Sequence, residues 1–295
     1  MKRRLFLKLI IMVLIFCRFF TSCNYSTNDN METNNSIEKN DILRVHFIDV
    51  GQGDSTLIQV NGFNVLIDAG PNSASYKLLP YLIGNDVEKI DYVIATHPDE
   101  DHIGSMDEVI KNFNIGILYA PKLTKNTDTF INMVKALKSK GLKINVAKDD
   151  IALNLGEDII LDFLAPIEEN YEEVNNYSVV TKLTYKNISM LFMGDAEDLV
   201  EAQLLRDKVD IDTDVIKIGH HGSSSSTSDD FLRVVSPEYA IISCGKNNRY
   251  KHPHKETINK LENAKVAIYR TDLLGTIIIS SDGNNITTTT MDQAK

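Results

Sequence analysis

The chain has 295 residues, of which 43% are apolar and 24% are charged, so it can bury a sizeable core in one large or two ordinary domains. Residues 1–23 hold five Lys and Arg and no acidic residue, so from Asn24 onward 26 basic residues face 41 acidic ones. An acidic body of this kind excludes a broad electrostatic platform for nucleic acid. We expect any contact with phosphate to be local and assisted by metal.

Residues 1–23 predict an export segment. Three basic residues at positions 2–4 precede an apolar run at 9–17, which is typical of a signal sequence and short for a bilayer-spanning helix. Small residues directly before Cys23 resemble a bacterial lipoprotein processing site, in which the cysteine is lipidated. We therefore expect an exported, extracytoplasmic protein that is tethered to the membrane through Cys23. An uncleaved signal anchor is the alternative.

Residues 24–40 are polar and rich in Asn, which predicts a flexible tether. The folded domain is then expected over residues 41–295. It opens with strands at 43–50, 55–60 and 63–68, and Asn61-Gly62 favours a tight hairpin between the last two.

Strands and helices alternate in the rest of the domain. The expected helices are at 75–83, 103–113, 128–140, 197–206, 229–235 and 254–264. The expected strands are at 91–96, 117–120, 143–147, 158–163, 178–185, 188–193, 214–218, 239–243, 266–269, 276–280 and 285–290. Two successive groups of strands and helices predict an α/β fold of two packed β-sheets with helices on their outer faces.

Residues of the types that bind metals follow three of these strands. His97, Asp99, Asp101 and His102 come directly after strand 91–96, while other strands lead to Asp195 and to His220-His221. Each cluster alone is better explained as a solvated turn. Because strand ends at one edge of a sheet converge, the three clusters together favour a shared metal site in a cleft.

The chain resembles the metallo-β-lactamase superfamily. The stretch from His97 to His102 is similar to that family's metal-binding signature, with Asp99 at the second ligand position. The stretches at 47–55, 219–223 and 250–254 are similar to the soluble hydrolase-like domain of the ComEC family of DNA-uptake proteins, and the likeness covers about 43–281. It implies a four-layer αβ/βα sandwich of two mixed β-sheets with outer helices. Since no polytopic channel segment is seen in this sequence, a role in DNA import does not carry over.

The resemblance implies two divalent metal ions. The implied ligands are His97 and Asp99 for one ion, Asp101, His102 and His220 for the other, and Asp195 as the bridge. This set of three carboxylates and three imidazoles favours Mn²⁺ without excluding Zn²⁺. Many family members supply a further His where this chain has Asn175-Asn176, so the first site is expected to be looser or completed by water.

Further residues are expected to support the metals. The resemblance places Asp68 behind a ligand His, which such a carboxylate orients through the free ring nitrogen. Asn176 stands at the missing His position, and His221 and His252 are candidates for contact with an anionic substrate oxygen. The loop at 51–54 either lines the cleft or is a structural turn. Asp101 and Asp195 are the expected catalytic residues.

Two metals can generate hydroxide from a shared water and stabilise charge on the group under attack. We therefore expect a metal-dependent hydrolase of phosphodiester bonds, a nuclease or phosphodiesterase, with an anionic phosphodiester as its partner and DNA among the candidates. A hydrolase of lactams, lactones or thioesters is an alternative that Asp99 and the missing His fit poorly. A tethered, non-catalytic binding module is a second alternative, against which the intact ligand set argues.

Overall fold

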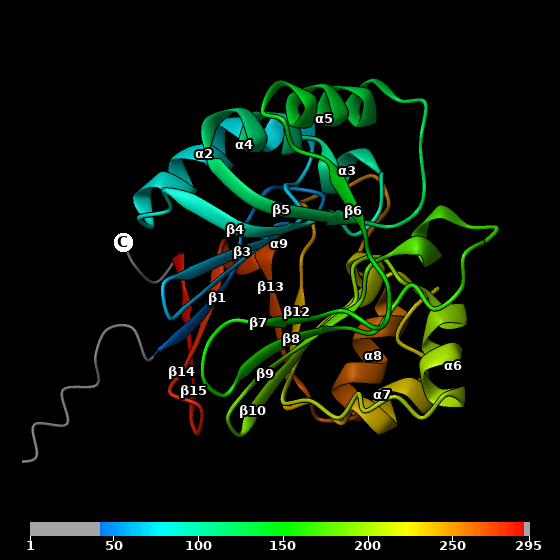
Figure 1. Ribbon diagram of the computed structural model, residues 1–295. Coiled ribbons are helices and arrows are strands. Elements are labelled where there is room, and N and C mark those ends of the chain that lie inside the picture. Colours follow the sequence, from blue (N-terminus) through cyan, green and yellow to red (C-terminus); the bar gives the residue numbers. More distant parts are fainter. Residues whose placement is uncertain (1–41, 292–295) are drawn as a thin grey trace, which may run out of the picture. The chain divides into compact units, whose positions relative to one another are not determined.

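The computed structural model describes residues 42–291 of the chain. The expected export segment at 1–23 and the expected tether at 24–40 lie outside these residues, as do Asp41 and residues 292–295. Within 42–291, the strands form one eight-stranded and one seven-stranded sheet, each with helices on its outer face (Figure 1). No helix in this part of the chain has the length and apolar character needed to cross a membrane.

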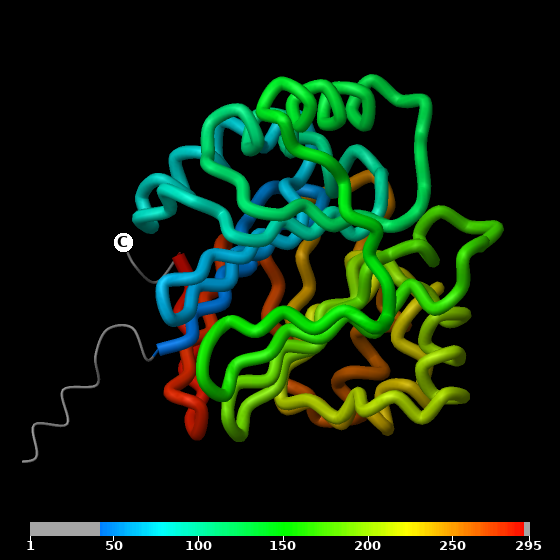
Figure 2. The backbone as a smooth tube through the Cα atoms, viewed as in Figure 1, coloured from blue at the N-terminus to red at the C-terminus, as the bar shows by residue number. Residues whose placement is uncertain are grey.

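The first sheet has the strand order β15-β14-β1-β2-β3-β4-β5-β6. Its strands are β1 (Leu43–Phe47), β2 (Thr56–Val60), β3 (Phe63–Ile67), β4 (Lys89–Ile94), β5 (Asn114–Ala120), β6 (Ile144–Val146), β14 (Ile277–Ser281) and β15 (Ile286–Thr290). Pairing is antiparallel up to β3 and parallel from β3 to β6. Figure 2 shows the red C-terminal hairpin beside the blue β1, so the two ends of the domain complete one sheet.

The second sheet has the strand order β13-β12-β11-β10-β9-β8-β7. Its strands are β7 (Ala152–Asn154), β8 (Ile159–Phe163), β9 (Thr181–Tyr185), β10 (Ile188–Phe192), β11 (Val215–Lys217), β12 (Tyr239–Ile242) and β13 (Ala267–Arg270). Pairing is antiparallel from β7 to β10 and parallel from β10 to β13. Both sheets are therefore mixed, and each has a parallel side on which strand ends share an edge.

Helices cover the outer face of each sheet. They are α2 (Ser75–Gly84), α4 (Met106–Asn112) and α5 (Asp128–Ser139) on the first sheet, and α6 (Asp198–Arg206), α7 (Asp229–Val235) and α8 (Lys255–Asn263) on the second. Each helix buries an apolar stripe against its sheet, for example Leu78 and Leu82 of α2 beside Leu66 of β3. A third apolar core, which includes Val45 and Leu183, lies between the sheets. The four-layer sandwich predicted from the sequence is confirmed.

The helix expected at 103–113 is wrong in its boundaries. It is two helices, α3 (Glu100–Ile103) and α4, with Gly104 between them. A Cβ on Gly104 would lie 2.1 Å from the backbone nitrogen of Asn72 in the short 3-10 helix η1 (Asn72–Ala74), so the chain needs a glycine where these segments touch. The short elements β7 and α9 (Thr271–Leu274) were not predicted.

The tight hairpin predicted at Asn61-Gly62 is confirmed. Both residues have positive φ angles, 49° and 79°, as a type I′ turn requires, and Val60 pairs with Phe63 across it. His46, expected to pack in its strand, is buried in β1, and its Nδ1 lies 2.8 Å from the hydroxyl of Tyr81. It therefore takes no part in the candidate site.

Candidate metal centre

The candidate site lies where parallel strands end. In the first sheet, β3 leads to Asp68, and β4 leads to His97 and then to α3. In the second sheet, β10 leads to Asp195, and β11 leads to the short 3-10 helix η3 (Gly219–Gly222). Because the carboxyl ends of parallel strands share an edge, each sheet presents its polar residues toward the same cleft.

Four buried side chains converge at the centre of this cleft. Asp54, His102, Asp195 and His221 each offer one ligand atom, and these atoms lie within 4.8 Å of one another. His102 Nε2 is 3.2 Å from Asp195 Oδ1, and His221 Nε2 is 3.4 Å from Asp195 Oδ2. Asp101 adds a fifth group, with Oδ2 3.3 Å from His221 Nε2. Imidazole nitrogens and carboxylate oxygens at these separations make a ligand set for a divalent metal ion.

The hydrogen bonding of these atoms tests whether a metal fits. Among the described residues, Nε2 of His97, His102 and His221 and Oδ1 of Asp195 are buried without a hydrogen-bond partner. An unsatisfied buried polar atom costs about 1–3 kcal/mol, and several rarely occur together without a reason. A cation bound between His102, His221 and Asp195 would satisfy three of these atoms, and one bound beside His97 would satisfy the fourth, so the residues fit the metals that the donor set implies.

His102 is held from behind by Asp68. Its Nδ1 lies 2.7 Å from Asp68 Oδ2, and the same carboxylate accepts hydrogen bonds from the backbone nitrogen and hydroxyl of Thr96 at 2.8 and 2.6 Å. Burial opposes protonation of His102, but Asp195 and then Asp68 outweigh it and hold its pKa well above the usual value. Asp68 holds the proton on Nδ1, so a metal at the centre would bind Nε2 once it has displaced the second proton of the ring.

His221 is held in the same way by the second sheet. Its Nδ1 lies 2.9 Å from the carbonyl oxygen of Ser243 at the end of β12 and 3.3 Å from Asp54 Oδ1. Both His220 and His221 have left-handed backbones, with φ angles of 47° and 53°. This unusual turn directs the imidazole of His221 into the centre, beside Asp101 and Asp195.

Asp54 reaches the centre from the loop between β1 and β2. A Cβ on Gly53, whose φ is 139°, would lie 2.2 Å from the carbonyl oxygen of Asp101, so only glycine lets this loop approach α3. Asp54 forms a buried ion pair with Lys217 of β11, and Lys217 Nζ also donates to the carbonyl oxygen of Gly194 at 3.1 Å. Burial opposes ionisation of Asp54, but Lys217 and His221 outweigh it and lower its pKa.

His97 and Asp99 form the other side of the centre. His97 Nε2 lies 3.9 Å from Asp195 Oδ2 and 4.0 Å from Asp99 Oδ2. Burial, and next the neighbouring charge of His102, lower the pKa of His97 to about 4, so the imidazole is neutral near pH 7. Asp99 is one third exposed and its Oδ1 forms an ion pair with Lys125. This side of the centre is therefore open toward solvent, and its Asp99 carboxylate is already paired with the ammonium group of Lys125.

His220 lies at the edge of the centre. Its Nε2 is 4.0 Å from Asp195 Oδ2, and its side chain is 23% exposed. Its Nδ1 lies 3.1 Å from both Glu197 Oε1 and the hydroxyl of Ser225. The contact with His220 lowers the pKa of Glu197, although partial burial opposes this shift. Glu197 and Ser225 thus fix the ring with Nε2 toward the centre.

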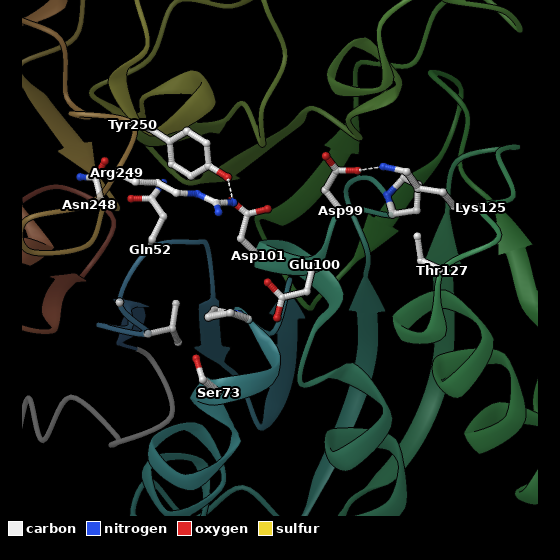
Figure 3. A pocket seen from close by; sticks show the side chains of 14 residues that line it. Gln52, Ser73, Asp99, Glu100, Asp101, Lys125, Thr127, Asn248, Arg249 and Tyr250 are labelled. Atoms are coloured by element: carbon white, nitrogen blue, oxygen red, sulfur yellow. Dashed lines mark hydrogen bonds and ion pairs between the residues drawn. The ribbon is translucent and has the colours of Figure 1, made fainter.

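A pocket of about 640 Å³ opens beside the site (Figure 3). Asp99, Glu100 and Asp101 line its acidic floor, and Lys125 and Arg249 lie on opposite sides of it. An acidic surface between two basic side chains is suited to an anion once the floor is neutralised by a cation.

Comparison with known proteins agrees with this geometry. Residues 48–246 match the model of the metallo-beta-lactamase superfamily. The chain belongs to this superfamily. Among solved structures, it is similar to the metallo-beta-lactamase fold protein YhfI from Bacillus subtilis, with a TM-score of 0.56, 14% sequence identity, and coverage of 82% of this chain and 100% of that one. At this identity the likeness shows the fold.

Curated relatives narrow the comparison. The chain is 33% identical over 251 residues to ComE operon protein 3 of Bacillus subtilis (strain 168), which covers 79% of this chain and 32% of that protein. It is 30% identical over 245 residues to Recombination protein 2 of Haemophilus influenzae, which covers 80% of this chain and 29% of that protein. The chain therefore spans about a third of the length of these relatives. The superfamily and the buried cluster together imply a metallo-hydrolase with divalent metal ions.

The structure brings the sequence-predicted ligands together, with two differences in arrangement. His221, expected beside the substrate, lies between Asp101 and Asp195, while His220, expected as a ligand, lies farther out and is partly exposed. Asn176 is buried, and its Oδ1 accepts a hydrogen bond of 3.1 Å from the backbone nitrogen of Glu197. This amide therefore holds the turn after Asp195.

His252 lies behind the pocket wall. Its ring is edge-on to that of His220, with centroids 5.3 Å apart, and it stacks with the rings of His221 and Tyr250 at 6.0 and 5.6 Å. Burial lowers the pKa of His252 to about 4, with His221 as the next cause. The ring is thus neutral near pH 7 and packs between the centre and the exposed loop at 248–250.

Several site residues were missed or left open by sequence reasoning. Asp54 was noted only within a loop that either lines the cleft or turns, and Lys217, Lys125 and Arg249 were not considered. One signal was present: Lys217 interrupts an apolar strand that is otherwise expected to be buried. A lysine in such a strand predicts a buried carboxylate partner.

Proposed function

We propose that this member of the metallo-β-lactamase superfamily hydrolyses phosphodiester bonds with two divalent metal ions, Mn²⁺ or Zn²⁺. One observation carries the proposal. Buried imidazole and carboxylate atoms of the centre lack hydrogen-bond partners among the described residues, and they adjoin a pocket that has the basic side chains of Lys125 and Arg249 on its walls. Such a pocket suits an anionic substrate better than a neutral lactam, lactone or thioester.

The two ions would be held on either side of Asp195. The deeper side offers Asp101, His102 and His221, and the shallower side offers His97 and Asp99. Bound there, divalent ions supply a water of lowered pKa as the nucleophile and stabilise charge on the phosphoryl group. The carboxylate count of this set favours Mn²⁺.

Side chains around the centre would orient the reaction. Asp101 lines the pocket, so its carboxylate is placed to accept a proton from the attacking water. His221 and His102 help to keep Asp101 ionised and lower its pKa, although burial opposes this. His220, oriented by Glu197, is placed to donate a hydrogen bond from Nε2 to a substrate oxygen when it is protonated.

Nucleic acid is the phosphodiester that the relatives favour. The name of Recombination protein 2 refers to recombination, and that of another relative, Competence protein ComA of Neisseria gonorrhoeae, refers to competence; the match covers about a third of each. The acidic body of the chain argues against long duplex DNA held along its surface. We therefore propose a single-stranded or short nucleic-acid substrate that enters by the pocket.

A substrate panel tests the proposal. The full chain, loaded with Mn²⁺ or Zn²⁺, is given bis(p-nitrophenyl) phosphate, single-stranded DNA and RNA, a cyclic dinucleotide and a chromogenic cephalosporin. We expect metal-dependent cleavage of phosphodiesters, lost in Asp195→Asn and retained in Asp230→Asn, whose side chain is 78% exposed on α7. Cleavage of the cephalosporin alone, or bound metal without any turnover, would overturn the proposal.

Export and lipidation at Cys23 are proposed on the sequence alone. The lipoprotein pattern would place the hydrolase outside the cytoplasmic membrane, held by its N-terminal lipid. Metabolic labelling with a palmitate analogue, compared between the wild type and Cys23→Ser, tests this. A label that persists in the variant would contradict lipidation at Cys23.

A further inference from the structure

The pocket wall at 248–250 carries an arginine in an unusual setting. Arg249 and Tyr250 are exposed, and Arg249 Nη2 forms a short hydrogen bond with the Tyr250 hydroxyl. The guanidinium carbon lies 4.7 Å from the centroid of the Tyr250 ring. A guanidinium fixed by both a hydrogen bond and an aromatic ring is partly preorganised for a ligand.

This arginine is connected to the metal centre through stacked rings. Tyr250 stacks on His252, with centroids 5.6 Å apart and planes inclined by 20°, and the ring of His252 packs against those of His220 and His221. The backbone is fixed as well, because the side-chain amide of Asn248 donates to the carbonyl oxygen of His252 at 2.6 Å. These contacts fix the position of Arg249 relative to the metal centre, with the rings of Tyr250 and His252 between them.

The charges of the pocket leave Arg249 available. Within residues 42–291, Lys125 on the opposite wall is paired with Asp99, whereas the side-chain contacts of Arg249 are the hydrogen bond and the ring contact with Tyr250 and include no ion pair with a carboxylate. Asp101 and Glu100 face it only at longer range and, after the hydrogen bond to Tyr250, help to raise its pKa. Figure 3 shows Arg249 and Tyr250 on the side of the pocket opposite Lys125.

We propose that Arg249, braced by Tyr250, is a binding subsite for a second phosphate group of the substrate, next to the phosphodiester that is cleaved. The inference rests on the proposed function and names its substrate class more narrowly. The scissile phosphate belongs between the ligands of the centre. Arg249 lies on the far side of the Tyr250 and His252 rings from the centre, so its guanidinium N–H groups are placed to donate hydrogen bonds to the phosphate next to the scissile one. A substrate with two or more successive phosphates, such as a nucleic-acid strand, can occupy both the metal centre and the Arg249 subsite. A substrate with a single phosphodiester leaves the subsite empty.

Two matched dinucleotides test the subsite. Thymidylyl-thymidine, TpT, has one phosphate, whereas pTpT has a second phosphate at its 5′ end and TpTp has one at its 3′ end. For the Mn²⁺-loaded full chain, we expect Arg249→Ala to raise the KM for pTpT or for TpTp relative to that for TpT on the order of tenfold to a hundredfold, as loss of a charge-assisted hydrogen bond predicts. Arg249→Lys should restore part of the ratio, since the charge remains and the fork is lost.

A charge-matched control separates contact from general electrostatics. Lys246→Ala removes one positive charge from the same exposed loop, outside the residues that line the pocket, and should leave the KM ratio unchanged. An equal rise of KM for all three dinucleotides in Arg249→Ala would place the arginine on the scissile phosphate and overturn the subsite. A KM ratio that is unchanged in Arg249→Ala, or that Lys246→Ala raises equally, would overturn it as well.

Direct binding distinguishes failure of the subsite from failure of the proposed function. If the wild type cleaves no dinucleotide, calorimetric titration of the metal-loaded chain with pTpT and TpTp still reports on Arg249. Binding that Arg249→Ala weakens tenfold or more would support the subsite without hydrolysis. Binding that is absent, or equal in the wild type and the variant, would overturn the subsite whatever the activity.

Discussion

The two sides of Asp195 differ in how completely the protein has built them. On the deeper side, His102 and His221 are buried, and each ring is held from behind, by Asp68 and by the carbonyl oxygen of Ser243. On the shallower side, His97 is buried but Asp99 is one third exposed and is paired with Lys125. A metal entering the deeper side finds its ligands in place, whereas one entering the shallower side must first displace an ammonium group.

The contrast indicates that the two metal sites proposed on either side of Asp195 are not equivalent. Preorganised ligands lose little freedom when a metal binds, so the deeper side is expected to bind first and more tightly. Asp99 of the shallower side lines the pocket together with Asp101, so we expect ligand exchange and substrate entry to take place at this pocket. Variants of each side can sharpen or abolish the difference.

Loss of the bridge should have the largest effect. Asp195→Ala removes the one carboxylate shared by both sides, so both metals should be lost on dialysis and turnover should fall by more than about a hundredfold. Mutation of residues behind a ligand alone costs about 10- to 100-fold. Metal analysis after gel filtration and phosphodiester turnover measure the effect, with Asp230→Ala on the exposed face of α7 as the control. Retention of two metals would show that Asp195 does not bridge.

Lys217→Met should lower the free energy of unfolding of the domain by removing an ion pair from the deeper side. The substitution leaves the buried Asp54 carboxylate without its cation, which costs about 3–5 kcal/mol of unfolding free energy. Urea unfolding of the metal-free chain measures this change. The double variant Asp54→Asn with Lys217→Met should recover part of the loss, because no charge is then stranded. Equal stability of both variants and the wild type would contradict a structural role for the pair.

The adjacent residues His220 and His221 offer a matched test of whether the more deeply buried histidine is the metal ligand. His221→Gln should lower metal affinity by at least about tenfold, since its Nε2 lies 3.3 and 3.4 Å from Asp101 and Asp195. His220→Gln should lower affinity less and act more on turnover, because His220 is farther out and partly exposed. Competitive titration with a fluorescent chelator compares the two. The reverse order would return the ligand role to His220, as the sequence first indicated.

Lys125→Met should produce the smallest effect and should act in the opposite direction. Removal of the ammonium group frees Asp99, so the second equivalent of metal should bind up to about fivefold more tightly, the upper range for a partly exposed ion pair. Calorimetric titration with Mn²⁺ resolves the second binding step. Tightening of the first step instead would mean that the shallower side fills first.

Much of the fold could be predicted from the sequence because its signals are local. The Asn61-Gly62 turn, the apolar strands and the amphipathic helices each appear within a few residues. The edge strand β7 has only three residues, too few for alternation to show, and the break at Gly104 depends on contact with Asn72, more than thirty residues away. The sequence therefore missed a very short edge strand and a helix break that a distant contact defines.

The residues of the candidate site likewise separate into those with a local sequence signal and those whose positions depend on the fold. Ligand types at His97, Asp101, His102 and Asp195 are visible as a spaced pattern after strands. The choice between His220 and His221 depends instead on two successive left-handed residues, which point adjacent rings in different directions. The pairing of Asp54 with Lys217 joins a loop of the first sheet to strand β11 of the second, 163 positions apart in the sequence, and no local pattern encodes it.

That ion pair also bears on how the domain can move. Asp54 belongs to the first sheet and Lys217 to the second, so their contact fastens the two sheets to each other directly under the metal centre. A metal ligated by His102 on one side and His221 on the other would add a second fastening at the same edge. Local opening between the two sheets should then be most frequent at the opposite edge, near the hairpin turns. Amide hydrogen exchange should be slowest beside the site, where many enzymes are most mobile.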